Sequence, residues 1–592
     1  MDKIFIIIEF ALMILLFIIA KHSVKRPSNK WRLFYAAPIF VAIAVTLCEG
    51  FDVYHAGIYF ASALPIVSLF LEAKKVRAKQ LIATGSALII AANLVVICIA
   101  PNYHGVAYLK DFEQGFEIMR EHYVLTQEKE IDWDRLYAKY QPMFKAVDEK
   151  QDYVENYKAW KRFTTEFYDG HVGYEMEGEK KQLDAICRSY GNDYGLSLAR
   201  TASGEYVAIN VEGYAHSYSI SGSDEDELGL YSVKGKYVTK SAQAKRLTLQ
   251  DAGIANGTVI TKWNGKAIDE YFEEVDYYFN QYPVRENEEF YLPAYVAGIG
   301  SGMAYGETFV PGKDGKAGPT VTISFLDASG DEKTVEVPCL GSYAPRMIDT
   351  FEKLENGLNV TNLNWQEVSP DTYAIRISEM SYDQQTYGGT DYQELTEKFR
   401  EEVLALKEAG VKTLIFDLRS NCGGSPYFVE AIAKLFAPKG EHLAYYSAVI
   451  NEKTASYERG ADGKYQKGVA STYEGEDLWH DGQIVLLVNA STVSAGDDMV
   501  YMMGAYPNVQ VTGLTRSNSS CQAVIGMTMR AGTLAFSSVP NLLPSGEVAI
   551  DTFADHVGRT PFDAYVPFDQ EAITAIFDQG EDYVLNYVIA AK

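Results

Sequence analysis

Residues 481–500, DGQIVLLVNASTVSAGDDMV, constrain the fold most, because they join a buried-strand pattern to a helix pattern at one serine. The apolar run 484–488 is typical of a buried strand, and the helical pattern begins near Ala495. Ser494 stands where the connecting loop becomes the helix. A side-chain oxygen at such a turn lies beside free backbone N–H groups, which suits an acyl-transfer nucleophile. The simpler interpretation is a helix N-cap.

Composition narrows the possible functions of the chain. Its 592 residues exceed what one core supports and suggest about three or four domains. Hydrophobic residues make up 47% and charged residues 22%, which excludes global disorder. The net charge of −26 argues against a nucleic-acid partner, because phosphate binding needs a basic surface. The six cysteines lack the spacing of a zinc site or a disulfide framework, although a single bridge stays open, so we expect no metal or cofactor.

The first 101 residues predict a membrane segment. Four apolar stretches are near spanning length, at residues 4–20, 33–48, 56–71 and 81–100. The second and third could instead form one tilted hairpin. Lysine and arginine gather in the loops after the first and third stretches, whereas the loop with Glu49 and Asp52 has neither. By the positive-inside rule, everything after Pro101 is extracytoplasmic, which predicts a multi-pass protein of the cell membrane.

Residues 102–175 predict a small helical domain that ends at a histidine. Apolar and aromatic residues recur through this segment at helical spacing. The sequence Asp169-Gly170-His171 then marks a turn and places His171 at the entry to a strand. A lone histidine is most often structural or merely exposed, so its assignment depends on the rest of the chain.

Residues 186–345 alternate short β-like runs with glycine and asparagine turns. The run 252–266, AGIANGTVITKWNGK, resembles the PDZ pattern of a helix end, a turn, a strand and an Asn-Gly hairpin. The loop before the strand at Tyr194, Gly195 and Leu196 can offer backbone N–H groups to a peptide carboxylate, as PDZ domains do. The alternative is an ordinary β module. The stretch 213–247 is longer than a compact PDZ domain needs, which predicts an insertion.

Residues 357–592 alternate strands and helices, which predicts a mainly parallel sheet with functional residues at the carboxyl ends of its strands. The run 417–424, DLRSNCGG, lies on such a loop. Its glycines, Gly423 and Gly424, let backbone N–H groups approach a substrate closely. The plain interpretation is a tight turn in which Asp417 pairs with Arg419. The sharper hypothesis is an oxyanion wall beside Ser494.

These motifs together resemble the C-terminal-processing (tail-specific) serine peptidase family. The resemblance rests on DLRSNCGG, STVSAGDD with its serine, the PDZ-like run and the Asp-Gly-His turn, and it covers roughly residues 110–590. It implies a ClpP/crotonase-like α/β core, an inserted PDZ domain and hydrolysis of peptide bonds in proteins. The membrane segment falls outside it.

The general base distinguishes two branches of this family. One branch uses a lysine about two dozen residues after the serine. Here Asn518 stands at that position, and no lysine occurs between Ser494 and the last residue, Lys592. Asparagine cannot accept a proton at neutral pH, so the Ser–Lys dyad is excluded. The other branch, which resembles the tricorn-core proteases, uses an upstream histidine, and His171 matches its position.

The resemblance also supplies the remaining site residues. Asp555 matches the acidic residue of the family, with Glu547 in reserve, and Gly170 replaces a serine that this branch can carry before its histidine. His556 is a rival base. The oxyanion donors are the backbone N–H groups of Ala495, Gly424 and Gly423.

The resulting expectation is a membrane-anchored, extracytoplasmic serine endopeptidase that cuts exported or surface proteins. Ser494 attacks, His171 acts as base and then acid, and the PDZ-like domain binds substrate C-termini. Its partners are protein or peptide substrates, and lipid through the N-terminal helices. The departures at Asn518 and Asp555 motivate one alternative, a catalytically inactive membrane protein that binds and senses peptides.

Overall fold

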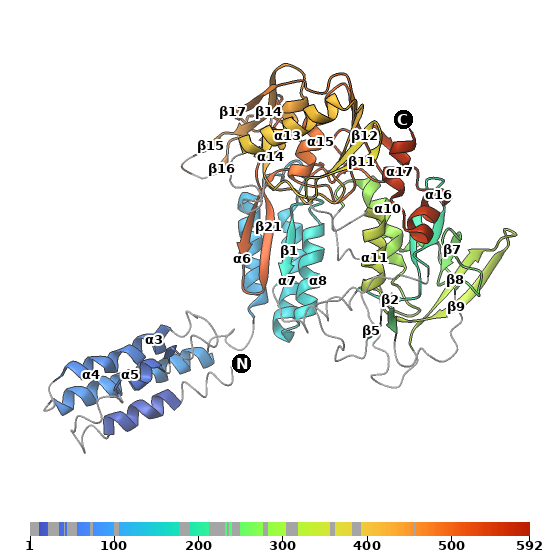
Figure 1. Ribbon diagram of the computed structural model, residues 1–592. Coiled ribbons are helices and arrows are strands. Elements are labelled where there is room, and N and C mark those ends of the chain that lie inside the picture. The colour runs from blue at the N-terminus through green and yellow to red at the C-terminus, as the bar shows by residue number, and fades with distance from the viewer. Residues whose placement is uncertain are drawn as a thin grey trace. The chain divides into compact units, whose positions relative to one another are not determined.

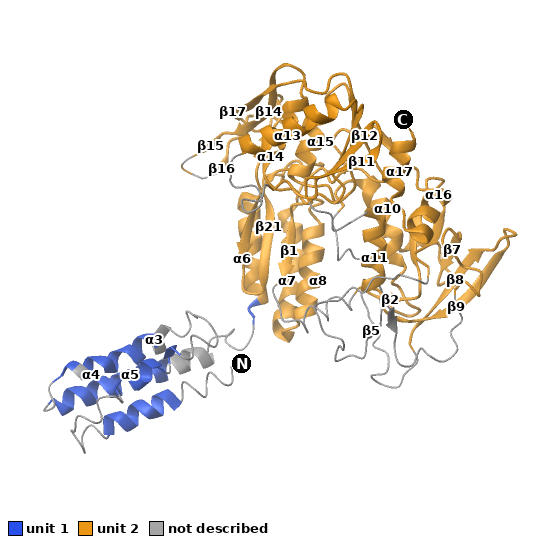
Figure 2. Ribbon diagram, viewed as in Figure 1, with its two compact units in different colours: residues 1–107 blue, residues 108–592 orange. Residues whose placement is uncertain are grey.

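The chain forms two compact units, Met1–Ala107 and Tyr108–Lys592 (Figure 2). The computed structural model describes residues 11–21, 35–40, 42–43, 56–71, 75–99, 106–176, 190–211, 231–233, 236–238, 249–275, 282–303, 318–355, 362–381, 392–451, 453 and 456–591.

The first unit is helical. Its named helices are α3 Ala56–Ala63, η3 Leu64–Ile66, α4 Val67–Phe70 and α5 Val76–Ile99. Parts of the predicted spans at 4–20 and 33–48 lie outside the described residues. Within the described residues, no helix combines the length and the apolarity needed to cross a bilayer, so the four predicted spans are not supported.

The second unit opens with three helices around an aromatic core. They are α6 Tyr108–His122, α7 Trp133–Lys150 and α8 Tyr153–Thr165. Asp132 caps α7, because its carboxylate accepts the Arg135 N–H at 2.9 Å. Phe112 of α6 stacks on Phe144 of α7 with ring centroids 4.3 Å apart. These helices lie beside β1 and β21, so the bundle supports the turn that carries His171 (Figure 1).

A β-rich module follows. Its elements are β2 Asn192–Asp193, β3 Ser197–Arg200, β4 Tyr206–Ile209, β5 Tyr231–Val233, β6 Lys236–Val238, β7 Ile260–Trp263, η5 Ile268–Tyr271, α10 Arg285–Val296, β8 Thr320–Leu326, β9 Glu332–Pro338 and β10 Gly341–Ser342. Asn264 and Gly265 follow β7 with φ of 47° and 79°, the positive values that an Asn-Gly hairpin turn requires. The helix α11, Ala344–Glu355, leads from this module to the core.

The core is built on a six-stranded sheet in the order β11-β12-β13-β18-β19-β23. Its strands are β11 Asn364–Ser369, β12 Thr372–Arg376, β13 Thr413–Asp417, β18 Gln483–Leu487, β19 Val509–Gly513 and β23 Ala564–Tyr565. Only the β11–β12 pair in this sheet is antiparallel. The predicted α/β core is therefore confirmed. The carboxyl ends of β13 and β18 are neighbours, which brings the DLRSNCGG and STVSAGDD loops together.

Alternating side chains of this sheet enter two hydrophobic cores. Leu414, Phe416, Ile484 and Leu486 pack with three helices, α13 Tyr392–Glu408, α14 Pro426–Phe436 and α15 Ala495–Met503. Ile415, Val485 and Leu487 belong to the other core, which α11 and the C-terminal helices share. The C-terminal elements are α16 Gln570–Ile573, η6 Thr574–Gln579 and α17 Tyr583–Ala590.

Smaller sheets complete the unit. The strands β14 Gly440–Ala448, β17 Lys467–Gly475 and β22 Asn541–Leu542 form one, and β15 Ile450–Asn451 pairs with β16 Ser456–Tyr457. The strand β1, Gly173–Met176, pairs antiparallel with β21, Gly532–Val539, and β20, Ala523–Thr528, lies on the other side of β21. The turn at residues 169–171 leads directly into β1 of this last sheet. The segment 514–522 leads from β19 into β20 of the same sheet.

Candidate active site

Ser494 occupies a sharp turn between β18 and α15. Its backbone has φ 62° and ψ −127°, a strained conformation for a residue with a side chain. The side chain makes no cap hydrogen bond to the helix, although the residue holds the N-cap position. The structure therefore disfavours the N-cap interpretation. A strained strand-to-helix turn of this kind presents a serine oxygen outward, as nucleophile turns do.

The glycine loop lies directly against this serine. A Cβ added to Gly423 would be 2.4 Å from Ser494 Cβ and 2.9 Å from Ser494 Oγ. Asn421 shapes the loop, because its amide donates to Ile377 O at 2.8 Å and its Oδ1 accepts the Gly423 N–H at 2.9 Å. The Asn421 carbonyl in turn accepts the Val493 N–H at 3.0 Å. The two loops are therefore one hydrogen-bonded assembly.

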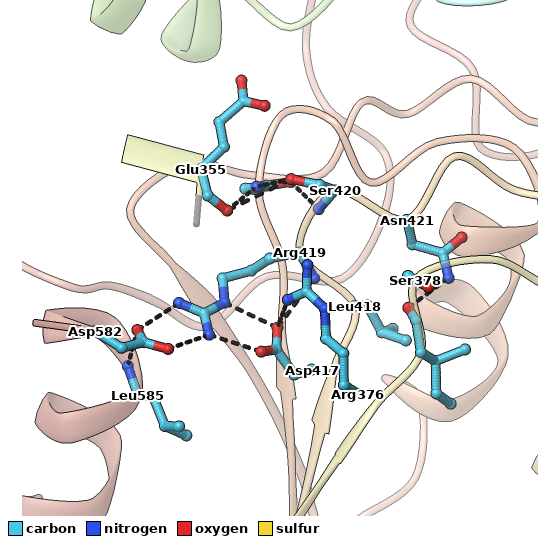
Figure 3. Close-up of polar contacts among 12 residues, drawn as sticks. Glu355, Arg376, Ser378, Asp417, Leu418, Arg419, Ser420, Asn421, Asp582 and Leu585 are labelled. Carbon is cyan, nitrogen blue, oxygen red and sulfur yellow. Dashed lines mark hydrogen bonds and ion pairs between the residues drawn. The ribbon is translucent and has the colours of Figure 1, made fainter. Parts of the chain in front are cut away.

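Buried ion pairs anchor the base of the loop (Figure 3). The guanidinium of Arg419 binds Asp417 at 2.6 and 2.8 Å and Asp582, the N-cap residue of α17, at 2.7 and 2.8 Å. Arg376 also contacts Asp417, at 2.8 Å. Burial raises the pKa of Asp417, but the pairs with Arg419 and Arg376 outweigh it and lower this pKa to about 2. The predicted Asp417–Arg419 ion pair is therefore present in the same loop as Gly423, which lies against Ser494.

The glycine loop also receives support from α11. Ser420 donates to the carbonyl of Glu355 at 3.4 Å (Figure 3). Asn489 donates to the same carbonyl at 3.0 Å. The Glu355 carboxylate accepts Ser491 Oγ–H at 2.6 Å. Glu355, the last residue of α11, therefore contacts both the glycine loop and the loop that leads to Ser494.

The predicted oxyanion donors differ in whether their N–H groups are engaged. The Gly423 N–H is occupied by Asn421. For Gly424 and Ala495, no acceptor lies within hydrogen-bond reach of the N–H anywhere in the described part of the chain. Ala495 is the first residue of α15, where an N–H has no partner inside the helix. Gly424 and Ala495 are therefore the two donors available to a substrate oxygen.

His171 lies beside the segment that follows β19. Its backbone N–H donates to Asp169 Oδ1 at 2.9 Å, which fixes the turn. Within the described residues, no hydrogen bond joins His171 to Ser494, and the buried Nδ1 has no partner. Catalytic hydrogen bonds often tighten only when substrate binds, so this geometry does not conflict with a base role.

Ser520, which the sequence argument did not single out, joins the two halves of the site. Its carbonyl accepts the Ser494 N–H at 2.8 Å, and its Oγ accepts the Gly170 N–H at 2.9 Å. Ser520 is fully buried. One residue therefore connects the nucleophile turn with the histidine turn. No sequence signal marks it apart from its place two residues after Asn518.

Asn518 explains why glycine precedes the histidine. Its side chain donates to Ala490 O at 3.0 Å and lies against Gly170. A Cβ on Gly170 would come within 2.0 Å of Asn518 Oδ1. The position that holds lysine in the other branch is thus filled by an amide that leaves no room for a serine at residue 170.

The structure does not bring the predicted acids to the histidine. Asp555 is exposed and pairs with Arg559 at 2.9 Å, and Glu547 pairs with Lys464 at 3.1 Å. Asp169 is the carboxylate beside His171 instead. Its Oδ2 accepts the Tyr123 hydroxyl at 3.0 Å, and its charge partly opposes the burial that lowers the pKa of the His171 imidazole. Asp169 lies near the imidazole because it belongs to the same turn as His171, whose backbone N–H it accepts.

Two buried titratable side chains, Lys129 and Asp497, contact the segments that form the histidine turn and its neighbour, residues 519–520. Lys129 donates to Tyr168 O at 2.7 Å and to the carbonyl and hydroxyl of Thr552, each at 2.8 Å, so all three ammonium hydrogens are engaged. Asp497 accepts the Ser519 and Ser520 N–H groups at 3.1 and 3.0 Å. Burial raises the pKa of Asp497 to about 8. Lys129 thus supports the histidine turn and does not replace the missing lysine base.

The other predicted residues lie elsewhere. His556 stacks edge-on against Tyr168, with ring centroids 4.0 Å apart. Tyr194 and Leu196 are fully buried in the β-rich module. Within the described residues, no group of histidine, cysteine, aspartate and glutamate side chains is arranged to hold a metal ion.

The pH dependence of the reaction should reflect the surroundings of His171. Burial lowers the pKa of His171 from 6.5, while Asp169 and the backbone of Gln522 oppose this shift. We expect the acid limb of kcat/KM to have its midpoint below pH 6.5. Asp169→Asn should move that midpoint further down, because it removes a charge that stabilises the imidazolium. A midpoint above 6.5, or an upward shift in the variant, would contradict this.

Comparison with known proteins decides the class of the site. The sequence model of peptidase family S41 matches residues 371–547, which include both loops at the carboxyl edge of the sheet. The protein is a serine peptidase. The model of the tricorn protease C1 domain matches residues 107–155 of this peptidase, in the helices that precede His171.

Several solved structures are similar to this chain at low sequence identity. Mature CPAF complexed with lactacystin is 12% identical with a TM-score of 0.47, over 81% of the peptidase and 97% of CPAF. The photosystem II D1 C-terminal processing protease is 13% identical with a TM-score of 0.30, over 80% and 98%. The tricorn protease is 15% identical with a TM-score of 0.32, over 82% and 36%. Likenesses at these levels carry no argument about site residues. No curated protein matches the peptidase in sequence.

Proposed function

We propose that the peptidase is an endopeptidase in which Ser494 attacks the scissile carbonyl and His171 relays the proton. His171 accepts the Ser494 hydroxyl proton during attack and donates it to the leaving amine, as in the histidine-using, tricorn-core-like branch. The N–H groups of Ala495 and Gly424 stabilise the oxyanion. Asp169 stabilises the imidazolium between these steps.

The observation that carries this proposal is the conformation of Ser494. The strained turn, the absent cap bond and the contact with Gly423 have no role in simple helix capping. The Ser494 hydroxyl is half-buried beside Gly423, and the N–H groups of Gly424 and Ala495 have no acceptor among the described residues, which supports acyl transfer.

Turnover of an unfolded protein tests the proposal. The full-length chain, Ser494→Ala and His171→Ala are each incubated with casein, and new amino termini are counted. We expect fragments with the parent, none above background with Ser494→Ala and a large loss with His171→Ala. Equal cleavage by all three would refute the assignment. Retained binding of casein without cleavage by the parent would favour the alternative, an inactive peptide-binding sensor.

The location of the catalytic unit is a separate part of the proposal. The loop charges of residues 1–101 support membrane attachment with the catalytic unit outside the cytoplasm. Cys422 is exposed beside the glycine loop, so a membrane-impermeant maleimide reports its side. Labelling of Cys422 on intact cells, absent in Cys422→Ser, is expected. Labelling of Cys422 only after cell lysis would show that the catalytic unit lies in the cytoplasm.

A further inference from the structure

The loop that the sequence predicts as a carboxylate-binding site is filled by the chain itself. Gly195 has φ 91° and turns its N–H back onto Asp193 Oδ1 at 2.8 Å. Tyr194 and Leu196, on either side of it, are fully buried. The Asp193 carboxylate therefore occupies the place where a bound peptide would put its terminal carboxylate.

An aspartate turn of this kind is common in loops, so a second contact decides its meaning. Arg346, in the first turn of α11, binds the Asp193 carboxylate through Nε at 2.6 Å and Nη2 at 3.2 Å. The two side chains are 2% and 5% exposed. Arg346 also donates from Nη1 to Asn210 O at 2.5 Å. A buried bidentate pair does not open without leaving an uncompensated charge, so the carboxylate is fixed in the loop.

The strand that follows this loop is held in place by buried contacts as well. The strand β3, which follows the loop, packs on α10. The Tyr343 hydroxyl donates to Ala294 O on α10 at 2.7 Å and lies 2.7 Å from Ser197 Oγ on β3. Tyr343 is fully buried. Its side chain thus ties the strand to the helix.

We propose that Asp193 is a built-in substitute for a peptide carboxylate, and that this peptidase selects substrates without reading a free C-terminus. The inference rests on the proposed endopeptidase function and replaces its predicted mode of recognition through Tyr194, Gly195 and Leu196. The substrate class becomes internal, extended segments of unfolded proteins, whatever their terminal group.

Peptide binding tests this inference independently of catalysis. Fluorescein-labelled ten-residue peptides ending in alanine, leucine or valine are made as free acids and as amides. Their affinity for the full-length Ser494→Ala chain is measured by fluorescence anisotropy. We expect each acid and its amide to agree within about twofold, or neither to bind measurably. A free acid that binds at least about tenfold more tightly than its amide overturns the inference.

Chemical rescue tests the role of Asp193 directly. Asp193→Ala removes the carboxylate and leaves Arg346 and the Gly195 N–H facing a space of carboxylate size. Acetate should raise the thermal midpoint of this variant by several degrees, whereas chloride at equal ionic strength should not, and the parent should respond to neither. A folded Asp193→Ala chain that does not respond to acetate overturns the assignment.

A conservative variant covers the case in which Asp193→Ala does not fold. Asp193→Ser keeps a short polar side chain that can accept the Gly195 N–H, but it loses the charge that Arg346 requires and vacates part of the space. If Asp193 excludes free acids, this variant should bind them more tightly than their amides, and equal binding overturns the inference. Cleavage of casein by the parent reports on the proposed function alone, so the two claims fail separately.

Discussion

Gly423→Ala is expected to lower kcat by roughly 10²–10³-fold, because the added methyl group would occupy the space beside the reacting hydroxyl. It would lie 2.4 Å from Ser494 Cβ, and real contacts of this kind do not occur, so one of the two loops must move. The displaced loop carries Gly424, whose N–H would stabilise the oxyanion. Steady-state kinetics on a peptide cut from casein measure the effect.

Gly410→Ala is the matched control. Gly410 has φ 90°, close to the 88° of Gly423, but a Cβ added there would meet nothing within 4 Å in the described part of the chain. The variant carries the same backbone strain, costing roughly 1 kcal/mol, without a clash at the site. We expect Gly410→Ala to keep kcat unchanged. Equal losses of activity in both variants would show that strain, and not the wall beside Ser494, explains the result.

Arg419→Met is expected to lower the free energy of unfolding by about 3–5 kcal/mol. The substitution leaves the buried Asp417 carboxylate and Asp582 without the guanidinium that now holds both. Arg419 is 2% exposed, so water cannot replace the lost contacts. Urea titration measures the change, with the slope of the transition checked against the parent.

Arg120→Met provides the comparison on the surface. Arg120 pairs with Glu117 on α6, and both side chains are about half exposed, at 47% and 50%. Screening by solvent leaves such a pair worth about 0–1 kcal/mol. If Arg419→Met lowers the free energy of unfolding by no more than Arg120→Met does, the ion pairs at the base of the glycine loop do not anchor the site.

Local sequence patterns were sufficient to predict much of the core. The alternation of strands and helices is confirmed in β13, β18 and α15, and α15 begins at Ala495, where the sequence predicts the start of a helix. Gly410 ends α13 with a positive φ, which a C-terminal glycine signal indicates. These features depend on residues close together in the chain, where spacing and turn chemistry fix the structure.

The supporting residues of the site depend on contacts that no local pattern encodes. Ser520 contacts Gly170 across 350 residues, and Lys129 contacts Thr552 across 423. The sequence suggested Asp555 as the acid because of its motif position, but its short-range partner Arg559 holds it at the surface. Asp169 was visible in the turn motif, yet only the folded geometry shows its carboxylate beside the base.

The predicted carboxylate site illustrates the same limit. Gly195 has the positive φ of a turn residue, and its N–H donates to Asp193 Oδ1. Arg346, which lies 153 residues after Asp193 in the sequence, fixes the Asp193 carboxylate in this turn. A loop pattern predicts what backbone groups can bind, whereas the remote chain determines whether they are already occupied.

Covalent labelling by a fluorophosphonate tests the central claim, that Ser494 is a nucleophile activated by His171, most directly. The full-length chain is treated with the probe, and the modified residue and its rate of labelling are determined by mass spectrometry. We expect one adduct on Ser494, no adduct in Ser494→Ala, and labelling slowed by at least about 10²-fold in His171→Ala. An adduct on a different serine, or equal labelling rates with and without His171, would contradict the account.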